Sequence, residues 1–285
     1  MKNVIITGAN SGLGFETAKK IAKNSDYRVI LACRNAEKAA AAKEEIVKET
    51  GNEAVLTMSL DTSSLASVRA FADQVAAFGD PVDALVNNAG VSPQHGGTSV
   101  DGFELVFATN YLGHFLLVQL LQPYMSGDAR IYNVTSDMHN PPGGIAWPGA
   151  ENLAHPTEDD RRKYSYSKLC MIYLTHALDE KFRTEGKAIT VNSFNPGYMA
   201  GTNFSGGGGG KGRELMIKAT MPDRYSTVEQ SSDALAELVT GDAYAKISNE
   251  YFDRSTNTAK SSELSYDKAN EKELWEASLR YCSLA

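Results

Sequence analysis

The sequence predicts an α/β fold, a single doubly wound parallel sheet with helices on both faces. Two observations lead to this prediction. Short apolar runs alternate with stretches of helical periodicity along most of the 285 residues, and such alternation is typical of βαβ units. No repeat and no linker divides the chain, because the glycine run 206–210 is short and falls within the same pattern. We therefore expect residues 1–285 to form one domain.

In the first half of the chain, apolar runs rich in valine, isoleucine and leucine predict strands, and amphipathic or Ala/Glu/Lys-rich segments predict the helices between them. The expected strands occupy residues 4–7, 27–33 and 55–60, and a fourth begins at residue 83. The expected helices cover residues 15–23, 35–50 and roughly 64–78. Each strand is thus followed by a helix that can carry the chain back for a parallel strand.

The second half continues the pattern at longer spacing. The amphipathic segment 103–125 is expected to be a long helix that precedes a strand at 130–136. A loop rich in proline and glycine at 139–149 separates this strand from a helix over residues 164–182. The last expected strand lies within residues 188–197.

Composition narrows the class of protein. The chain has 42% hydrophobic and 22% charged residues, as in soluble globular proteins, and its net charge of −7 argues against a nucleic acid partner. Cys33, Cys170 and Cys282 are far apart and include no C-x-x-C pair, so neither a disulfide framework nor a metal site is expected. This cysteine usage fits a reducing cytosol.

The N-terminal residues and the apolar segments bear on where the protein is located in the cell. Residues 3–7 already read as a buried strand, so no signal peptide is expected. No apolar run is expected to be long enough to span a bilayer. The sequence therefore predicts a cytoplasmic protein.

A glycine-rich segment, TGANSGLG (7–14), lies between the first expected strand and the first expected helix. Gly8, Gly12 and Gly14 would allow the backbone to approach a pyrophosphate at the positive N-terminus of that helix. The alternative is a glycine-rich turn that only permits close packing of helix on strand. The position of the segment directly after the first strand favours a nucleotide site.

A second segment, KYSYSKLC (163–170), places Tyr164 and Lys168 four residues apart, on one face of a helix, while Tyr166 points away from that face. A tyrosine with its usual pKa of about 10 is a poor proton donor or acceptor at neutral pH. A cation beside it would favour the phenolate and bring the pKa closer to the working range. Taken alone, however, such a pair is usually an ordinary contact on a helix surface.

Six motifs in order decide between these alternatives: TGANSGLG (7–14), NNAG (87–90), NYLGHF (110–115), NVTS (133–136), YSYSK (164–168) and NPG (195–197). Together they resemble the short-chain dehydrogenase/reductase family over nearly the whole chain, which implies a Rossmann-type domain that binds NAD(P). The segments ACRN (32–35) and SKLC (167–170) are similar to its retinol dehydrogenase-like branch. The segments 196–204 and 266–285 are similar to light-dependent protochlorophyllide reductases.

The end of the second strand selects between the two forms of the cofactor. Proteins that bind NAD place an acid there, whereas an arginine accommodates the 2′-phosphate of NADP. Here the strand ends at Cys33, Arg34 and Asn35 with no acid, and a guanidinium suits bidentate contact with a phosphate. The alternative is a solvent-facing arginine. Lys38 could add charge, as its counterpart in the reductases does, so NADPH is the expected cofactor.

The resemblance implies further contacts to the cofactor. Asp61 matches the residue that contacts the adenine amino group, and residues 88–90 match the floor of the adenine pocket. Thr202 matches a threonine on the nicotinamide side. The full set implied to bind the cofactor is Gly8, Asn10, Ser11, Gly12, Leu13, Gly14, Arg34, Lys38, Asp61, Asn88, Ala89, Gly90, Tyr164, Lys168, Pro196, Gly197 and Thr202.

The resemblance also implies a catalytic set of four residues. Tyr164 is the general acid/base, and Lys168 binds the nicotinamide ribose and lowers the pKa of the tyrosine. Ser136 hydrogen-bonds the reacting oxygen, and Asn110 supports a water relay to the lysine. Thr135 is the alternative to Ser136, but the motif places the serine last. The chemistry would be hydride transfer from the cofactor, balanced by proton transfer from Tyr164.

Other residues near these motifs are given structural roles. Cys170 matches a cysteine of the protochlorophyllide reductases, yet it lies about 120° round the helix from Tyr164. We expect it to be a buried structural thiol. Tyr166 is expected to pack, and His114 is expected to be a packed or capping histidine.

The loop after Ser136 and the C-terminal part bear on the substrate. His139 and Trp147 either line the substrate pocket or lie at the surface. The segment around 198–226, with its run of five glycines, is expected to be a substrate lid. A helical extension is expected around 266–285.

The leading functional hypothesis is an NADPH-dependent oxidoreductase that reduces a carbonyl, or oxidises the alcohol, of a bulky apolar small molecule. The alternative enzyme is a carbon–carbon double-bond reductase of the protochlorophyllide reductase type, although the connection between Ser136 and Tyr164 is shorter than in those enzymes. A non-enzyme alternative is an NADPH-sensing regulator, but such proteins usually lack the tyrosine or the lysine. The expected state is a monomer or a homodimer.

Overall fold

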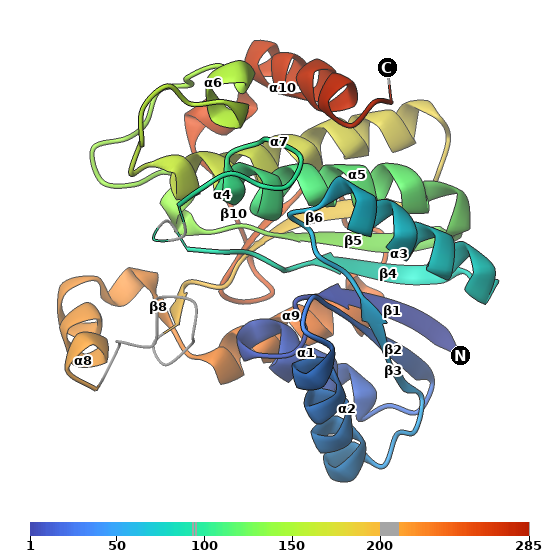
Figure 1. Cartoon of the computed structure of the whole chain (residues 1–285). Coiled ribbons are helices and arrows are strands. Elements are labelled where there is room, and N and C mark those ends of the chain that lie inside the picture. The colour runs from blue at the N-terminus through green and yellow to red at the C-terminus, as the bar shows by residue number, and fades with distance from the viewer. Residues whose placement is uncertain (93, 95, 200–210, 285) are drawn as a thin grey trace.

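In the computed structural model, which describes residues 1–92, 94, 96–199 and 211–284, one eight-stranded sheet forms the centre of the molecule (Figure 1). The strands run in the order β10-β9-β6-β5-β4-β1-β2-β3. All neighbours from β3 to β9 are parallel, and β10 alone is antiparallel to its neighbour. Their bounds are β1 (Lys2–Thr7), β2 (Tyr27–Cys33), β3 (Val55–Ser59), β4 (Val82–Asn87), β5 (Met125–Val134), β6 (Thr190–Asn195), β9 (Tyr251–Asp253) and β10 (Thr258–Ala259).

Helices cover both faces of this sheet, which confirms the predicted fold class (Figure 1). One face carries α1 (Gly12–Ala22), α2 (Ala36–Thr50) and α9 (Val228–Thr240). The other carries α3 (Leu65–Phe78), α4 (Leu105–Phe107), α5 (Gly113–Leu121) and α7 (Lys163–Thr184). Outside this second layer lie the short α6 (Ala150–Ala154) and the C-terminal α10 (Lys268–Tyr281). The strand order reverses between β1 and β4, so the crossovers from β1 to β3 pack on one face and those from β3 to β6 pack on the other.

The apolar runs of the strands are continuous because both faces of the sheet are buried. Along β1, Val4 and Ile6 join the core beneath α1, α2 and α9, whereas Ile5 joins the core beneath α3, α5 and α7. All three side chains are fully buried. A parallel sheet of this kind therefore needs no polar face along its central strands.

Several elements have no counterpart among the predicted ones. The seventh parallel strand, β9, has three residues and the antiparallel β10 has two, too few to show a period of two. Within the expected lid, β7 (Tyr198–Met199) pairs with β8 (Tyr225–Ser226) in a separate two-stranded sheet. Between them, α8 (Lys211–Thr220) projects from the body of the molecule (Figure 1).

The long apolar segment is helical, but it is not one regular α-helix. Between α4 and α5 it widens into a π-helical turn, η1 (Ala108–Leu112). The expectation that no apolar run is long enough to span a bilayer is wrong: the helical run Leu105–Tyr124 has 20 residues and a mean hydropathy of 1.2. Of the most apolar 18 residues in that run, 78% are buried inside the protein, as in the core helix of a globular domain.

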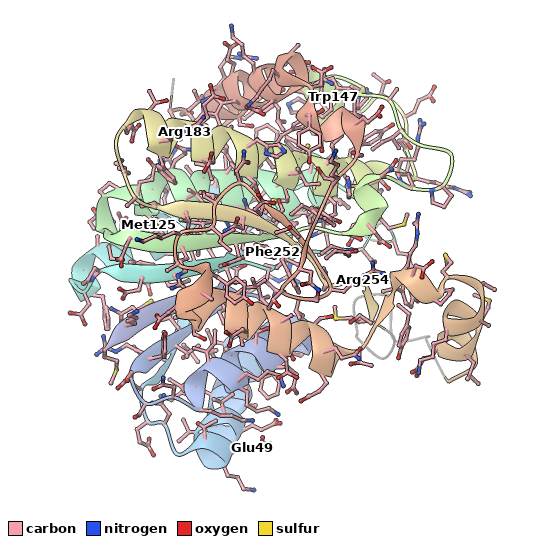
Figure 2. The ribbon with its side chains drawn as sticks, turned by 180° about the vertical axis from the view of Figure 1, so that it is seen from behind. Glu49, Met125, Trp147, Arg183, Phe252 and Arg254 are labelled. Carbon is pink, nitrogen blue, oxygen red and sulfur yellow. The ribbon has the colours of Figure 1, made fainter. Side chains whose placement is uncertain are left out.

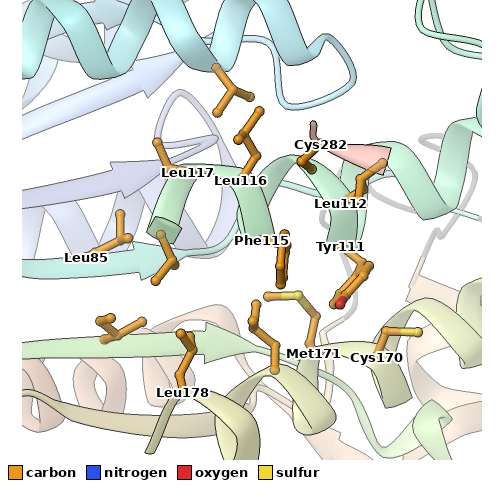
Figure 3. Close-up of a cluster of buried hydrophobic side chains, with 14 of the residues drawn as sticks. Leu85, Tyr111, Leu112, Phe115, Leu116, Leu117, Cys170, Met171, Leu178 and Cys282 are labelled. Atoms are coloured by element: carbon orange, nitrogen blue, oxygen red, sulfur yellow. The ribbon is translucent and has the colours of Figure 1, made fainter. Parts of the chain in front are cut away.

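The side chains of this segment pack between α7 and the C-terminus (Figure 3). Tyr111 and Phe115 face Cys170 and Met171 of α7, and all four are at most 1% exposed. The Tyr111 hydroxyl hydrogen-bonds Ser278 of α10 over 2.9 Å. The C-terminal helix is therefore part of the core and not a peripheral addition.

We expect Gly113→Ala to destabilise the protein. Gly113 lies where α5 passes Thr62, and a Cβ atom there would lie 2.0 Å from the Thr62 carbonyl oxygen. Alanine favours a helix over glycine by up to about 1 kcal/mol, whereas overpacking that moves backbone costs about 1–3 kcal/mol or more. The free energy of unfolding, measured in urea, should therefore fall.

Gly127→Ala is the matched control, because a Cβ atom at Gly127 of β5 meets nothing within 4 Å. Its free energy of unfolding should stay within about 0.5 kcal/mol of the parent protein. Equal stability of the two alanine variants would show that α5 can move away from Thr62 at little cost.

Candidate active site

The carboxyl ends of four parallel strands meet at one edge of the sheet. There β1 ends at Thr7, β4 at Asn87, β5 at Val134 and β6 at Asn195. In open α/β sheets, ligands bind at this edge, where the strand order reverses. Here the reversal lies between β1 and β4, and the motifs TGANSGLG, NNAG, NVTS and NPG begin within these strands and run past their ends.

Two hydrogen bonds join α7 to the end of β5. Lys168 Nζ donates to the Val134 carbonyl over 2.9 Å, and the Thr135 hydroxyl donates to the Lys168 carbonyl over 2.9 Å. Lys168 is 4% exposed, and burial lowers the pKa of its ammonium group to about 8. Since the Thr135 hydroxyl is engaged in this way, the geometry favours Ser136 over Thr135 for contact with a reacting oxygen.

Ser136 and Tyr164 come together although they lie on different elements. The Ser136 side chain hydrogen-bonds the side chain of Tyr164. The Met138 N–H donates to Ser136 Oγ over 3.1 Å, which caps the short 3-10 turn Asp137–His139. The Ser136 hydroxyl donates to Asp137 Oδ1 over 3.3 Å, which is longer than a usual bond between two oxygen atoms, so a closer acceptor could take this hydrogen.

The pKa of Tyr164 is raised in this structure, contrary to the expected effect of Lys168. Burial raises the pKa most, the hydrogen bond from Ser136 lowers it, and the Asp137 carboxylate raises it. Lys168 Nζ lies 5.7 Å from the centre of the Tyr164 ring and is directed to Val134. In the protein alone, Tyr164 is therefore a neutral phenol at neutral pH.

Asn110 is fully buried in the π-helical turn η1. Its side chain accepts a hydrogen bond from the Val91 N–H over 2.7 Å and donates to the Val91 carbonyl and to Ser167 Oγ over 3.1 and 3.0 Å. A Cβ atom on Gly90 would lie 3.2 Å from Asn110 Oδ1 and 3.8 Å from Lys168 Nζ. The structure thus brings Asn110 beside Lys168, and π-turns often occur at functional sites.

His114 links Asn110 to the first strand. Its Nδ1 lies 3.1 Å from the Asn110 carbonyl and its Nε2 lies 3.0 Å from Thr7 Oγ1. Thr7 Oγ1 also accepts hydrogen bonds from the Asn88 and Ala89 N–H groups, each over 2.8 Å. Burial lowers the pKa of His114 to about 4. The ring is therefore neutral and packed, as expected, and its Nδ1 carries the hydrogen that the Asn110 carbonyl requires.

The glycine loop has the shape that an anion at a helix N-terminus needs. Gly8 and Gly12 have φ values of +66° and +58°, which favour glycine. A Cβ atom on Gly14 would lie 2.5 Å from Asn88 Nδ2. Ser11 makes no side-chain cap to α1, and the first turn of this helix carries no acid. The N-terminus of α1 therefore suits a pyrophosphate.

Two other predicted residues of this loop have different surroundings. Leu13 is 6% exposed and packs in the core, so its side chain does not face solvent. The backbone N–H groups of Ala9 and Asn10 donate hydrogen bonds to the Cys33 thiol. Burial raises the pKa of this thiol to about 11. Asn10 itself is half-buried. For Leu13, only the backbone can contribute to a phosphate site.

Arg34 and Lys38 lie at the start of α2, where Asn35 caps the helix through the Lys38 N–H over 2.8 Å. The Arg34 side chain is 69% exposed, and Lys38 is also exposed. Asp61 holds the Ser63 N–H and hydroxyl with one oxygen, and its other oxygen lies 3.9 Å from Arg34. An acid thus does lie near Arg34, although it comes from the loop after β3 and not from the end of the second strand.

The NPG motif is fixed by its asparagine. Asn195 Oδ1 accepts hydrogen bonds from the Asp137 and Gly197 N–H groups over 3.1 and 2.9 Å, and its Nδ2 donates to Asp253 over 2.8 Å. Pro196 is buried, with its carbonyl bound by Ser231 Oγ over 2.7 Å. Asn195 therefore ties the serine turn, the NPG turn and the end of β9 together. Thr202 lies outside the described residues.

Sequence reasoning missed two arginines and two aspartates beside this region. Arg224 Nε lies 3.7 Å from Asp137 Oδ2, next to Ser136. Arg254 is ion-paired with Asp253, and its side chain covers Gly197, where a Cβ atom would lie 2.7 Å from it. Figure 2 shows Arg254 at the same end of the molecule as α8. No motif could have revealed the pairing of Arg224 with Asp137 or the packing of Arg254 over Gly197, since each brings together residues that are distant in the sequence.

The remaining predictions have mixed outcomes. Cys170 is fully buried and Tyr166 is 3% exposed, as expected of packing residues. Trp147, labelled in Figure 2, donates to Glu273 of α10 over 2.8 Å, and its ring packs edge-on against Tyr173. His139 is 5% exposed, so the alternative that it lies at the surface is wrong. Both of its ring nitrogens are hydrogen-bonded inside the protein.

Comparison with known proteins agrees with this geometry. The short chain dehydrogenase family model matches residues 2–147. Mouse retinol dehydrogenase 13 is 36% identical over the whole chain and 84% of its own length. Among solved structures, a Mycobacterium paratuberculosis protein has a TM-score of 0.75 at 26% identity, covering 99% of this chain and 94% of its own. An actinorhodin polyketide ketoreductase solved with NADPH has a TM-score of 0.67 at 25% identity, covering 93% and 97%.

These matches cover the segments that carry the ordered motifs at the carboxyl edge of the sheet. The family model spans β1 to β5, and the identity with the mouse relative runs through α7, β6 and α10 as well. On both grounds, the protein belongs to the short-chain dehydrogenase family and is an oxidoreductase.

Proposed function

We propose that the protein reduces a carbonyl group, or oxidises the corresponding alcohol, of a bulky apolar small molecule with NADPH, and that Tyr164 is the general acid/base. The observation that carries this proposal is the hydrogen bond between Ser136 and Tyr164. Two hydroxyl groups beside each other can donate to one oxygen atom, which suits a developing alkoxide better than a carbanion. The names of the relatives, retinol dehydrogenase and polyketide ketoreductase, support the same chemistry.

The buried residues around this pair fit a dinucleotide. Lys168 Nζ has three hydrogens, and within the described residues Val134 is its one hydrogen-bond acceptor. Two donors are left for hydroxyl groups such as those of a ribose, and burial makes such a bond more favourable. The open N-terminus of α1 suits the pyrophosphate. When bound, the cofactor supplies the hydride.

In the reduction, the protein has to hold the carbonyl oxygen and give it a proton. Ser136 donates a hydrogen bond to this oxygen while Met138 holds the serine in place. Tyr164 donates the proton, and its raised pKa keeps it in the protonated form that reduction requires. Lys168 and Asn110 hold the cofactor side of the site, and a water between them would return the proton to Tyr164.

The preference for NADPH over NADH rests on Arg34 and Lys38. Both are exposed at the end of β2 and the start of α2, where a 2′-phosphate would lie. The distance between Asp61 Oδ2 and Arg34 Nη1 is 3.9 Å, which is too long for a strong hydrogen bond. The guanidinium of Arg34 therefore stays available to a phosphate. The ketoreductase relative solved with NADPH supports this assignment.

The segment 198–226 is proposed to cover the substrate. Its described part includes Arg224, which reaches Asp137 beside the catalytic serine, and the β7–β8 pair that joins the two ends of the segment. Exposed Leu215 and Met216 on α8 give it an apolar surface, 66% and 55% exposed respectively. A lid of this kind suits an apolar substrate.

Arg34→Asp should remove the preference for NADPH. We expect the parent protein to bind NADPH at least tenfold more tightly than NADH, a difference of about 1.4 kcal/mol or more. The variant should lose most of its NADPH affinity and little of its NADH affinity, because a carboxylate repels the 2′-phosphate. Titration of both cofactors by fluorescence measures this.

Arg183→Asp is the control for charge, since Arg183 is exposed near the end of α7 and the change in net charge is the same (Figure 2). It should bind both cofactors like the parent. Equal affinity of the parent for NADPH and NADH would contradict the assignment of Arg34.

Tyr164→Phe should reduce kcat by at least about a hundredfold, as expected when a general acid is removed, with little change in NADPH affinity. The hydroxyl acts on the substrate, whereas other residues hold the cofactor. Tyr166→Phe is the control on the same helix, because Tyr166 is buried and its hydroxyl only reaches Asp160 over 3.4 Å. If Tyr166→Phe lost turnover and Tyr164→Phe kept it, the assignment of Tyr164 as the general acid/base would be wrong.

A substrate panel tests the reaction itself. We expect NADPH oxidation in darkness with apolar aldehydes or ketones. Protochlorophyllide, tested in darkness and in light, addresses the carbon–carbon double-bond alternative. Light-dependent product with no carbonyl turnover would favour that alternative, and NADPH binding without oxidation of any substrate would favour an NADPH-sensing regulator.

A further inference from the structure

His139 joins the serine turn to the C-terminal part of the chain. Its Nδ1 lies 2.7 Å from the Ser136 carbonyl, and the Ser262 N–H donates to its Nε2 over 3.0 Å. A backbone N–H can only donate, so Nε2 carries no hydrogen, and Nδ1 carries the hydrogen donated to Ser136. The two contacts therefore define one neutral tautomer of the ring.

The surroundings keep this ring neutral. Burial lowers its pKa, the carboxylates of Asp137 and Asp253 and the hydrogen bond to Ser136 raise it, and Arg224 lowers it. The ring of Tyr251 packs 5.4 Å away. Since the net effect is a lowered pKa, the ring stays neutral at pH 7 and can keep accepting from Ser262.

His139 makes two hydrogen bonds to the backbone carbonyl of Ser136. This carbonyl accepts a hydrogen bond from the His139 N–H over 3.0 Å as well as from the His139 ring. The serine hydroxyl oxygen accepts from Met138 within the same turn. Any shift of the His139 ring would therefore move the peptide that carries the Ser136 side chain.

We propose that His139 is a positioning residue for Ser136, and that Ser262, through its backbone N–H, makes the connection between β10 and α10 part of the support of the active site. This inference rests on the proposed function, in which Ser136 contacts the reacting oxygen. It assigns the segment 258–285 a role in catalysis besides packing. No contact of His139 with substrate or cofactor is needed.

Ser262→Pro tests the link without touching the histidine. Ser262 has φ −67° and ψ 152°, values that proline adopts, and Ser261 before it lies outside any helix. Proline removes the N–H that donates to His139, together with the serine hydroxyl. We expect kcat to fall by about threefold to tenfold, the effect of one lost hydrogen bond, with NADPH affinity and melting temperature close to those of the control.

Ser262→Ala is the matched control. It keeps the N–H, and the Ser262 hydroxyl oxygen is buried without a hydrogen-bond partner among the described residues. We expect kcat of this variant to equal that of the parent. A loss as large as that of Ser262→Pro would show that the side chain matters and would overturn the inference.

A double-mutant cycle separates positioning from general damage. In a Ser136→Ala background, Ser262→Pro should cause no further fall in kcat, because the residue being positioned is gone. An unchanged additional loss, or no loss from Ser262→Pro alone, would overturn the role of His139. Full activity of Ser136→Ala would instead contradict the proposed function.

A spectroscopic measurement covers the case in which the proline variant does not fold. Nitrogen-15 NMR of the parent protein should show the His139 ring with the hydrogen on Nδ1 at pH 7. A ring with the hydrogen on Nε2, or a charged ring, would be incompatible with the Ser262 contact and would overturn the inference.

Discussion

The arrangement of the site depends on one buried cation. Lys168 is 4% exposed, and an ammonium group in that position is tolerated only if it is hydrogen-bonded. Lys168 Nζ donates to the Val134 carbonyl, and the Thr135 hydroxyl donates to the Lys168 carbonyl. These two hydrogen bonds fix helix α7 against the end of β5. Because Ser136 follows β5 and Tyr164 precedes Lys168 by one helical turn, this contact also sets the distance between the two hydroxyl groups.

Polar contacts around this cation extend the constraint to the whole carboxyl edge of the sheet. His114 connects the π-turn of Asn110 with Thr7 at the end of β1, and Asn195 connects the ends of β6 and β9 with the serine turn. These side chains are buried and hydrogen-bonded, so the strand ends are held in register with one another. A rigid edge of this kind keeps reacting groups in place before a ligand arrives.

Much of this could be read from the sequence, and the limits have physical causes. The central strands and the flanking helices have clear periods, and the ordered motifs predict roles for Ser136, Tyr164 and Lys168, which the structure brings to the same end of β5. Strand β9 has three residues, too few for a period, and the π-turn in the long helix leaves the apolar pattern unchanged. The role of His139 depends on Ser262, which lies 123 residues away. The direction of the Tyr164 pKa depends on burial, which no motif encodes.

The central claim is that this edge of the sheet directs hydride to a carbonyl carbon while Tyr164 protonates the oxygen. The most direct measurement is turnover of an apolar ketone with NADPH that carries deuterium at both C4 positions of the nicotinamide, followed by mass spectrometry and NMR of the product. The account predicts one deuterium on the carbinol carbon. Deuterium on a carbon of a reduced double bond, or none in the product, would contradict it.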